Sequence, residues 1–130
     1  MKYVLAIYDD ESRFPALSQA EQEAEIEAYW RLDADAIEAG VFIASEPLQP
    51  TPETTTVVVR DEDAVVTDGP FAETKEQLGG FYLLDCESRE DAVAWAARIP
   101  AARHGRVEVR PVMEFEPPEW FREETKAGSA

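Results

Sequence analysis

Cysteine is nearly absent from this sequence: Cys86 is the only one in 130 residues. A lone thiol excludes an intrachain disulfide, and such sparing use of cysteine is typical of a reducing compartment. Cys86 directly follows Asp85, and an acidic neighbour disfavours the reactive thiolate, so we expect an inert thiol. The segment from Met1 to Asp9 is too short and too soon charged for a signal peptide. These features predict a cytoplasmic protein.

Basic residues are also scarce, with 12 Lys and Arg against 28 Asp and Glu and a formal net charge of -16. An acidic surface repels the phosphates of nucleic acids and of anionic membranes, so neither is an expected partner. No apolar run approaches the roughly 20 residues that cross a bilayer. A net charge of this size is typical of a well-solvated protein.

Several signatures of enzyme chemistry are missing. No group of His, Cys and Asp has the spacing of metal ligands. The sequence contains no glycine-rich phosphate loop and no Gly-x-Ser-x-Gly nucleophile turn. We therefore predict neither a metal site nor a cofactor.

The pattern of apolar and turn-forming residues predicts two helices and six strands. Ser18 with Glu21, and Ser88 with Asp91, are capping pairs that begin helices, because each serine can accept a hydrogen bond from a free backbone amide. The helices are expected over 18–39 and 88–99, and the strands over 3–8, 41–44, 54–60, 64–67, 81–85 and 106–115. The expected buried residues of the second helix and the last strand are Ala92, Trp95, Ala96, Ile99, Val107, Val109 and Met113.

The first helix carries an apolar stripe of Ile26, Tyr29, Trp30 and Ile37 at helical spacing, which predicts its buried face. Asp33 falls in the middle of this stripe. A carboxylate is costly to bury unless it is paired or hydrogen-bonded. Either Asp33 lies near an edge and reaches water, or it points into a cavity between helix and sheet as a deeper ligand-binding acid.

This order of elements is the split βαβ, ferredoxin-like sandwich of an α+β protein, with both helices on one face of an antiparallel sheet and an extra β-hairpin. One domain is expected over residues 1–116, followed by a charged tail over 117–130 that is mobile except around Trp120 and Phe121. The first strand is apolar on both faces, yet two helices cover only one face of the sheet. We therefore predict a homodimer whose sheets pack face to face.

The stretch from Thr67 to Phe81 holds more ionisable side chains than its turn and strand require. Asp68-Gly69-Pro70 is first a turn, in which Asp68 either hydrogen-bonds the turn's own amides or takes part in a site. Gly79-Gly80 lets another strand, a dimer mate or a ligand come close to the backbone.

Three ionisable residues, Glu73, Lys75 and Glu76, lie between this turn and the glycine pair. A lysine beside two acids can bind a polar ligand or orient a carboxylate for proton transfer. The alternative is a solvated loop on an acidic protein.

The loop and strand near the C-terminus hold His104, Glu108 and Arg110. His104 is either structural or solvated, or the one side chain that titrates near neutral pH in a site. Arg110 is a suitable anchor for a carboxylate or phosphate if its strand face lines a cavity. Otherwise Glu108 and Arg110 form ion pairs across strands or across a dimer.

The run from Asp68 to Phe81 resembles the signature of the bacterial DGPF proteins, within the YCII-related superfamily. The resemblance covers the chain from Lys2 to about Phe115 and implies a ferredoxin-like fold of the dimeric α+β-barrel type. Further segments that carry it are Gly40-Val41, Leu48-Gln49-Pro50, Trp95-Ala96-Ala97-Arg98-Ile99-Pro100 and Val107-Glu108-Val109-Arg110-Pro111-Val112.

The resemblance implies little about activity, because the family is largely uncharacterised. Relatives in the wider superfamily are suspected enzymes with a His–Asp pair whose histidine lies near the start of the first helix. The first helix expected here has no histidine, so that pair is not carried over. Some members are encoded beside, or fused to, extracytoplasmic-function sigma factors, which implies a regulatory setting.

Two hypotheses follow. In the first, a homodimer binds a small polar molecule in a cleft between the sheet, the first helix and residues 68–80, and acts by acid–base catalysis. In the second, the protein is a non-catalytic regulatory or interaction protein, linked to a sigma factor. A pocket onto which Glu73, Lys75 and His104 converge favours the first hypothesis, and salt-bridged side chains without a cavity favour the second. The candidates are Asp68, Glu73 and His104 as catalytic residues, and Lys75, Glu76, Arg110 and Asp33 as ligand-binding residues.

Overall fold

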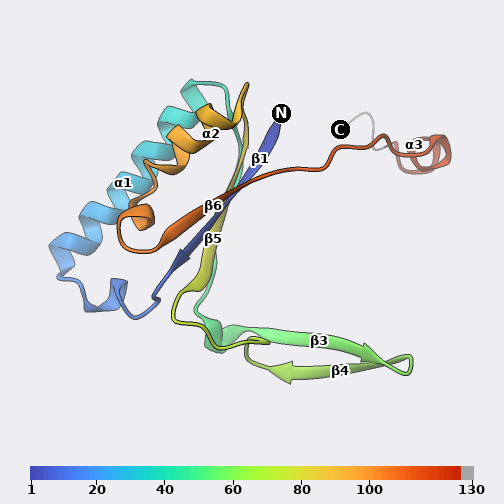
Figure 1. Ribbon diagram of the computed structural model, residues 1–130, viewed down its shortest axis with the longest axis horizontal. Coiled ribbons are helices and arrows are strands. Elements are labelled where there is room, and N and C mark those ends of the chain that lie inside the picture. The colour runs from blue at the N-terminus through green and yellow to red at the C-terminus, as the bar shows by residue number, and fades with distance from the viewer. Residues whose placement is uncertain (127–130) are drawn as a thin grey trace.

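The computed structural model describes residues 1–126. Its main unit is a four-stranded antiparallel sheet with strand order β2-β5-β1-β6, and both long helices cover one face of that sheet (Figure 1). A second sheet consists of the β3–β4 hairpin alone. The predicted ferredoxin-like α+β fold is thereby confirmed, although no barrel closes within the described chain. The elements are β1 (Lys2–Asp9), α1 (Gln19–Glu38), β2 (Phe42–Pro47), β3 (Thr55–Arg60), β4 (Asp63–Asp68), β5 (Gln77–Asp85), α2 (Arg89–Ala96), β6 (Arg106–Pro111) and α3 (Glu119–Thr125).

Both predicted helix starts are confirmed by their caps. The Ser18 hydroxyl accepts a hydrogen bond from the Glu21 amide, and the Glu21 carboxylate accepts one from the Ser18 amide at 3.0 Å. Ser88 accepts likewise from the amide of Asp91 at 3.1 Å. These bonds satisfy backbone donors that the first turn of a helix leaves unpaired. The second helix is shorter than expected, since it ends at Ala96.

The core lies between the sheet and the two helices. Alternate side chains of β1 and β5 point into it, as the period of two of a strand requires. Small alanines on α1 and α2 let the helices approach the sheet closely. The buried residues include Tyr3, Leu5, Ile7, Leu32, Ala36, Tyr82, Leu84, Ala92, Ala96 and Ile99.

The predicted buried face of α1 is wrong for three of its four residues, and only Tyr29 packs against the core. Ile26, Trp30 and Ile37 are 47%, 67% and 60% exposed, whereas Leu32 and Ala36 are buried. The helix is rotated by roughly a quarter turn from the expected orientation. This rotation allows polar side chains of α1 to form hydrogen bonds with the sheet and its loops, which apolar periodicity alone does not encode.

Within residues 1–126, nothing covers the face of the sheet opposite the helices. Val4, Ala6, Phe81 and Leu83 point to it and are only half-buried. The sequence predicts cover on both faces of the first strand, and the described part of the chain covers the face under the helices. The open face is apolar at its centre, along the two middle strands of the sheet.

Two arms leave the sheet on the side of its open face, away from α1 and α2 (Figure 1). The first is the β3–β4 hairpin, which confirms the predicted hairpin. The second runs from Met113 to Lys126 and carries α3, which the sequence pattern had not predicted. The last strand ends at Pro111, so the expected burial of Met113 is wrong: it is 81% exposed. The rest of the predicted tail, residues 127–130, lies outside the described residues.

Candidate functional site

Asp33 is held by a tyrosine that rises from the sheet. The hydroxyl of Tyr82, on β5, donates a hydrogen bond to Asp33 Oδ1 at 2.5 Å. Burial and this bond raise the pKa of Tyr82, so the phenol stays protonated and remains a donor. Asp33 itself is partly exposed, and within residues 1–126 its other oxygen, Oδ2, has no hydrogen-bond donor. The structure thus presents one bound and one available carboxylate oxygen.

The seam between α1 and the end of β1 holds a cluster of three charges. Arg13 Nη2 donates to both carboxylate oxygens of Glu25 at 3.0 Å, and Arg13 Nε donates to Asp9 Oδ2 at 2.9 Å. These side chains are only 14–20% exposed. The two carboxylates raise the pKa of the Arg13 guanidinium. Burial and the nearby Glu25 also raise the pKa of Tyr29 to about 12.

Residues 69–76 are partly fastened to the end of the sheet. Glu76 Oε1 forms an ion pair with Arg106 Nε at 2.6 Å. The Gln77 side chain accepts from the amide of Glu11 at 3.0 Å, so the loop after β1 is tied to the start of β5. Lys75 lies close enough to Asp10 to contribute, after Ser12, to the lowered pKa of that carboxyl. Glu76 is therefore part of an ion pair rather than an available acid.

The glycine pair serves the approach of two strands. A Cβ added at Gly80 would lie 2.8 Å from the carbonyl oxygen of Glu46 on the neighbouring β2. At Gly79 nothing lies within 4 Å of such an atom. Of the three occupants that the sequence allowed at Gly80, the structure shows another strand.

The other predicted catalytic residues do not converge within the described chain. Asp68 ends β4 and Glu73 lies in the following loop; both are exposed. His104 is exposed and lies two residues before the start of β6, whereas Arg110 lies near the other end of that strand. Within residues 1–126 no hydrogen bond or ion pair joins any two of Asp68, Glu73 and His104.

A short polar row lies at the edge of the open face. Arg106, Glu108 and Arg110 project from β6 beside the β1 residues Tyr8, Ala6 and Val4, in that order. Burial and the carboxylate of Glu108 raise the pKa of Tyr8. This row would face any molecule that covers the open face.

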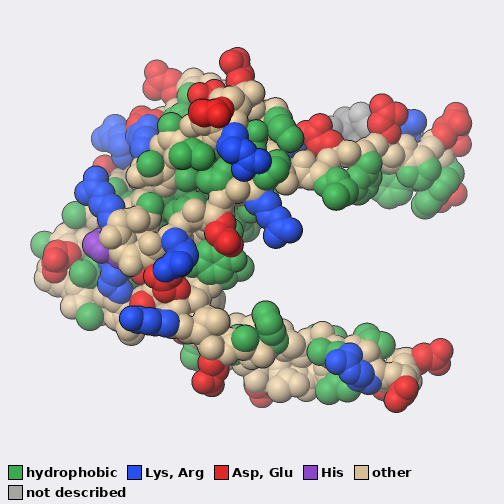
Figure 2. Space-filling model, in the orientation of Figure 1, with side chains coloured by type: hydrophobic (Ala, Val, Ile, Leu, Met, Phe, Trp, Pro, Cys, Tyr) green, Lys and Arg blue, Asp and Glu red, His purple; other side chains and the backbone are tan. Residues whose placement is uncertain are grey.

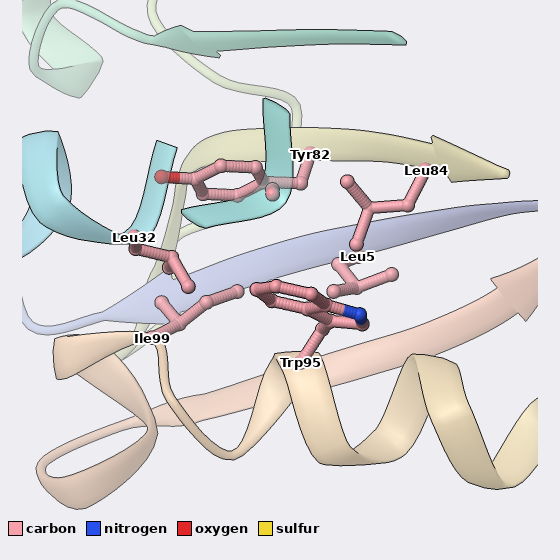
Figure 3. A pocket seen from close by; sticks show the side chains of 7 residues that line it. Leu5, Leu32, Tyr82, Leu84, Trp95 and Ile99 are labelled. Carbon is pink, nitrogen blue, oxygen red and sulfur yellow. The ribbon is translucent and has the colours of Figure 1, made fainter. Parts of the chain in front are cut away.

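An apolar slot lies between α1, α2 and the sheet, and Figure 3 shows how its side chains fill it. Trp95 lies against Leu5 and Ile99, and the Tyr82 ring closes the side next to α1 (Figure 3). The slot has no room for a water-sized molecule. Arg98 stacks over Trp95 at 5.0 Å from the ring centre and forms an ion pair with Asp35 on α1. We regard the slot as core packing.

A second hollow, of about 340 Å³, lies where α1 ends beside β5 and α2. Its wall includes the carboxylates of Asp85, Glu87 and Asp91, together with Cys86. Cys86 is buried, and burial followed by the two neighbouring aspartates raises its thiol pKa, as expected for an inert cysteine. None of the seven predicted site residues lines either hollow.

Residues 1–116 match the model of the YCII-related domain. The chain belongs to the YCII-related domain family. A relative from Rhizobium meliloti (strain 1021), described as an uncharacterised protein, is 38% identical over 121 residues, which is 92% of this chain and 98% of the relative. Family membership therefore fixes the domain and leaves its activity open.

Two further observations bear on this YCII-related protein. In the part of the chain that the structure describes, no helix is long and apolar enough to cross a membrane. Within the same residues, no three His, Cys, Asp or Glu side chains lie close enough together to hold a metal ion.

Sequence reasoning found Asp33 in this YCII-related chain but missed the residues that hold the seam together. Tyr82, Arg13 and Glu25 gave no local signal, because their partners lie 49 and 12 residues away. A charged residue in an apolar stripe indicates that some partner exists. It does not identify the partner, which tertiary structure alone brings into place.

Proposed function

We propose that the protein is a homodimer that binds a small polar molecule at Asp33, and that Asp33 accepts a proton or hydrogen bond from it. The observation that carries this proposal is the bond from Tyr82 to Asp33 at 2.5 Å, which leaves Oδ2 available at a partly exposed position. A carboxylate oriented by a permanent donor is suited to general-base chemistry. The same arrangement suits recognition of an N–H or O–H group.

The charge around Asp33 limits which kinds of molecule can bind there. The chain has a net charge of -16, and the site is centred on the carboxylate of Asp33. The other acids of α1 near it, Glu25 and Asp35, are paired with Arg13 and Arg98. Such a site attracts neutral or cationic molecules and repels anions. Lys75 and Arg110, which were expected to help bind the ligand, remain candidates only for a separate site at the end or the edge of the sheet.

The open face of the sheet supports the homodimer. Val4, Ala6, Phe81 and Leu83 form its apolar centre, and a contiguous apolar face of this kind is typical of an interface. A second copy presents the same face, so two chains related by a twofold axis cover each other. The row of Glu108 and Arg110 then lies at the border between the copies, where opposite charges can pair.

The run from Asp68 to Phe81 supports a finer assignment within the family, to its DGPF branch. That assignment keeps a second candidate function: a non-catalytic regulatory or interaction protein that works with an extracytoplasmic-function sigma factor. The ion pair of Glu76 with Arg106, and the absence of the predicted residues from both hollows, favour this reading for residues 68–80.

A thermal-shift screen of neutral and cationic metabolites tests the ligand proposal. A compound that raises the Tm of the wild type should bind Asp33→Asn at least about tenfold more weakly, because a hydrogen bond to a charged group is lost. Asparagine keeps an oxygen that accepts from Tyr82, so the fold should be unaffected.

Asp91→Asn is the matched control, since Asp91 is an exposed aspartate of α2. It should bind every compound as the wild type does. Equal binding by Asp33→Asn, or a broad screen without a single shift of the wild-type Tm, would remove the support for this site and leave the non-catalytic reading.

A further inference from the structure

The apolar stripe of α1 has no cover within the described chain. Ile26, Trp30 and Ile37 are 47–67% exposed, and their spacing of four and seven residues places them within about 40° around the helix. Asp33 lies on the same side, three residues after Trp30 and four before Ile37. Whatever covers this stripe therefore also covers the carboxylate that Tyr82 holds.

The hairpin arm exposes more apolar surface than a hairpin with no other contacts is expected to expose. Val57 and Val66 are cross-strand partners, and Val59 lies two residues along on the same face. These three valines are 59–61% exposed. A two-stranded hairpin alone is marginally stable in water, and exposed valines add a cost in solvation. The hairpin needs a surface to lie on.

The C-terminal arm also exposes large apolar side chains. Met113 and Phe115 are each 81% exposed, and Trp120 is 59% exposed. The helix α3 has seven residues, too few to be stable alone in water. Figure 2 shows the two arms on either side of a concave flank of the molecule, with apolar side chains along the side of the C-terminal arm that faces the hairpin.

The total surface is far larger than a compact monomer would have. The accessible surface is 9761 Å², whereas a folded monomer of 14.6 kDa exposes roughly 6900 Å². The excess is about 2900 Å², well above the roughly 800 Å² that each partner buries in a standard interface. An obligate dimer with large, apolar contacts accounts for an excess of this size.

The length of the hairpin indicates how far it would extend along a second copy packed on the open face. Six residues in each strand span about 20 Å. Facing sheets pack about 10 Å apart. A hairpin that leaves the sheet on its open side therefore passes the sheet of a second copy and ends at the level of that copy's helices.

We propose that the two arms of each chain clamp a second copy of this chain and cover its α1 stripe, including Asp33. The proposal rests on the homodimer proposed above and adds that the ligand site is completed by the other chain. The occupant is a second copy because one chain carries both apolar arms and an uncovered stripe, which a twofold axis brings together twice. The clamp shields Asp33 from water and makes its carboxylate a stronger acceptor.

Sedimentation equilibrium of Val57→Asp and Val66→Asp tests the clamp. Each change places a charge on the exposed hairpin face and should raise the dimer dissociation constant at least about tenfold. Val93→Asp is the matched control, because Val93 is a 50% exposed valine of α2, which carries no residue of the hairpin or of the α1 stripe. It should leave the dissociation constant unchanged.

Trp30 reports directly on the cover of α1. In the background Trp95→Phe with Trp120→Phe, Trp30 is the only tryptophan. The clamp predicts blue-shifted emission and resistance to acrylamide in the dimer, and loss of both when Val57→Asp is added. If acrylamide quenches Trp30 freely in an intact dimer, the proposal that a second copy covers α1 is wrong.

The outcomes separate the two proposals. If the wild type has the mass of a single chain, the homodimer and the clamp are both overturned. If the wild type is a dimer and both hairpin variants keep its dissociation constant, the clamp alone is overturned. A ligand screen on that dimer would then still test the site at Asp33.

Discussion

Gly105→Ala is expected to destabilise the fold strongly. A Cβ at this position would lie 2.0 Å from the carbonyl oxygen of Tyr8 and 2.9 Å from the Cα of Asp9, and both are backbone atoms of the central strand β1. Backbone cannot move aside as a flexible side chain can, so the start of β6 must separate from β1. We expect a loss of roughly 3 kcal/mol or more, a large part of the 5–15 kcal/mol by which most domains are stable. Urea unfolding followed by circular dichroism measures it.

Gly79→Ala is the control for this change. Nothing lies within 4 Å of a Cβ at Gly79, and its φ is not in the left-handed region. The free energy of unfolding should change by less than about 1 kcal/mol, since alanine fits an extended strand without strain. If Gly105→Ala were as stable as Gly79→Ala, the pairing of β1 with β6 described here would be wrong.

Arg13→Ala is expected to destabilise the protein by about 3 kcal/mol at pH 7. It removes the cation from Asp9 and Glu25, which then face each other as two poorly solvated carboxylates. Breaking a largely buried pair costs more than the pair contributes, because the remaining charge has no partner. Chemical unfolding of the variant and the wild type measures the difference.

Arg31→Ala is the matched control on α1. Arg31 lies 3.9 Å from Glu27, and both side chains are 71% exposed. An exposed pair of this kind contributes little, so the free energy of unfolding should change by less than about 0.5 kcal/mol. A loss for Arg13→Ala no larger than that for Arg31→Ala would show that the seam of α1 is not held by this cluster.

Local features of the fold were predictable from sequence. The caps at Ser18 and Ser88 fixed the helix starts, because their partners lie three residues away. The hairpin followed from a β-branched run, an acidic turn and a returning run. Each of these signals is complete within a few residues, so no tertiary knowledge was needed. The order of elements then restricted the topology to the split βαβ pattern.

The orientation of α1 could not be predicted in the same way. Apolar spacing favoured Ile26, Trp30 and Ile37 as the buried face, and in the single chain Leu32 and Ala36 are buried instead. A stripe pattern marks residues that avoid water, but it does not say whether their own chain or another chain covers them. If the clamp holds, the stripe was correctly read as an apolar surface and wrongly assigned to the core of one chain.

The candidate site was likewise only partly predictable from sequence. Asp33 was recognisable as a charge out of place in an apolar stripe, whereas Tyr82 became its partner only through packing of β5 under α1. The conspicuous run from Asp68 to Phe81 carried the family signal. Glu76 within it pairs with Arg106 at the end of the sheet, so this run is at least partly architecture.

The central claim is that a second copy of the chain covers the open sheet and the α1 stripe. Sedimentation equilibrium of the unmodified protein at micromolar concentration tests it most directly. We predict a single species with twice the chain mass of 14.6 kDa that does not dissociate on dilution through this range. A species with the mass of one chain would contradict the account, because the apolar face, both arms and the stripe beside Asp33 would then all be left in water.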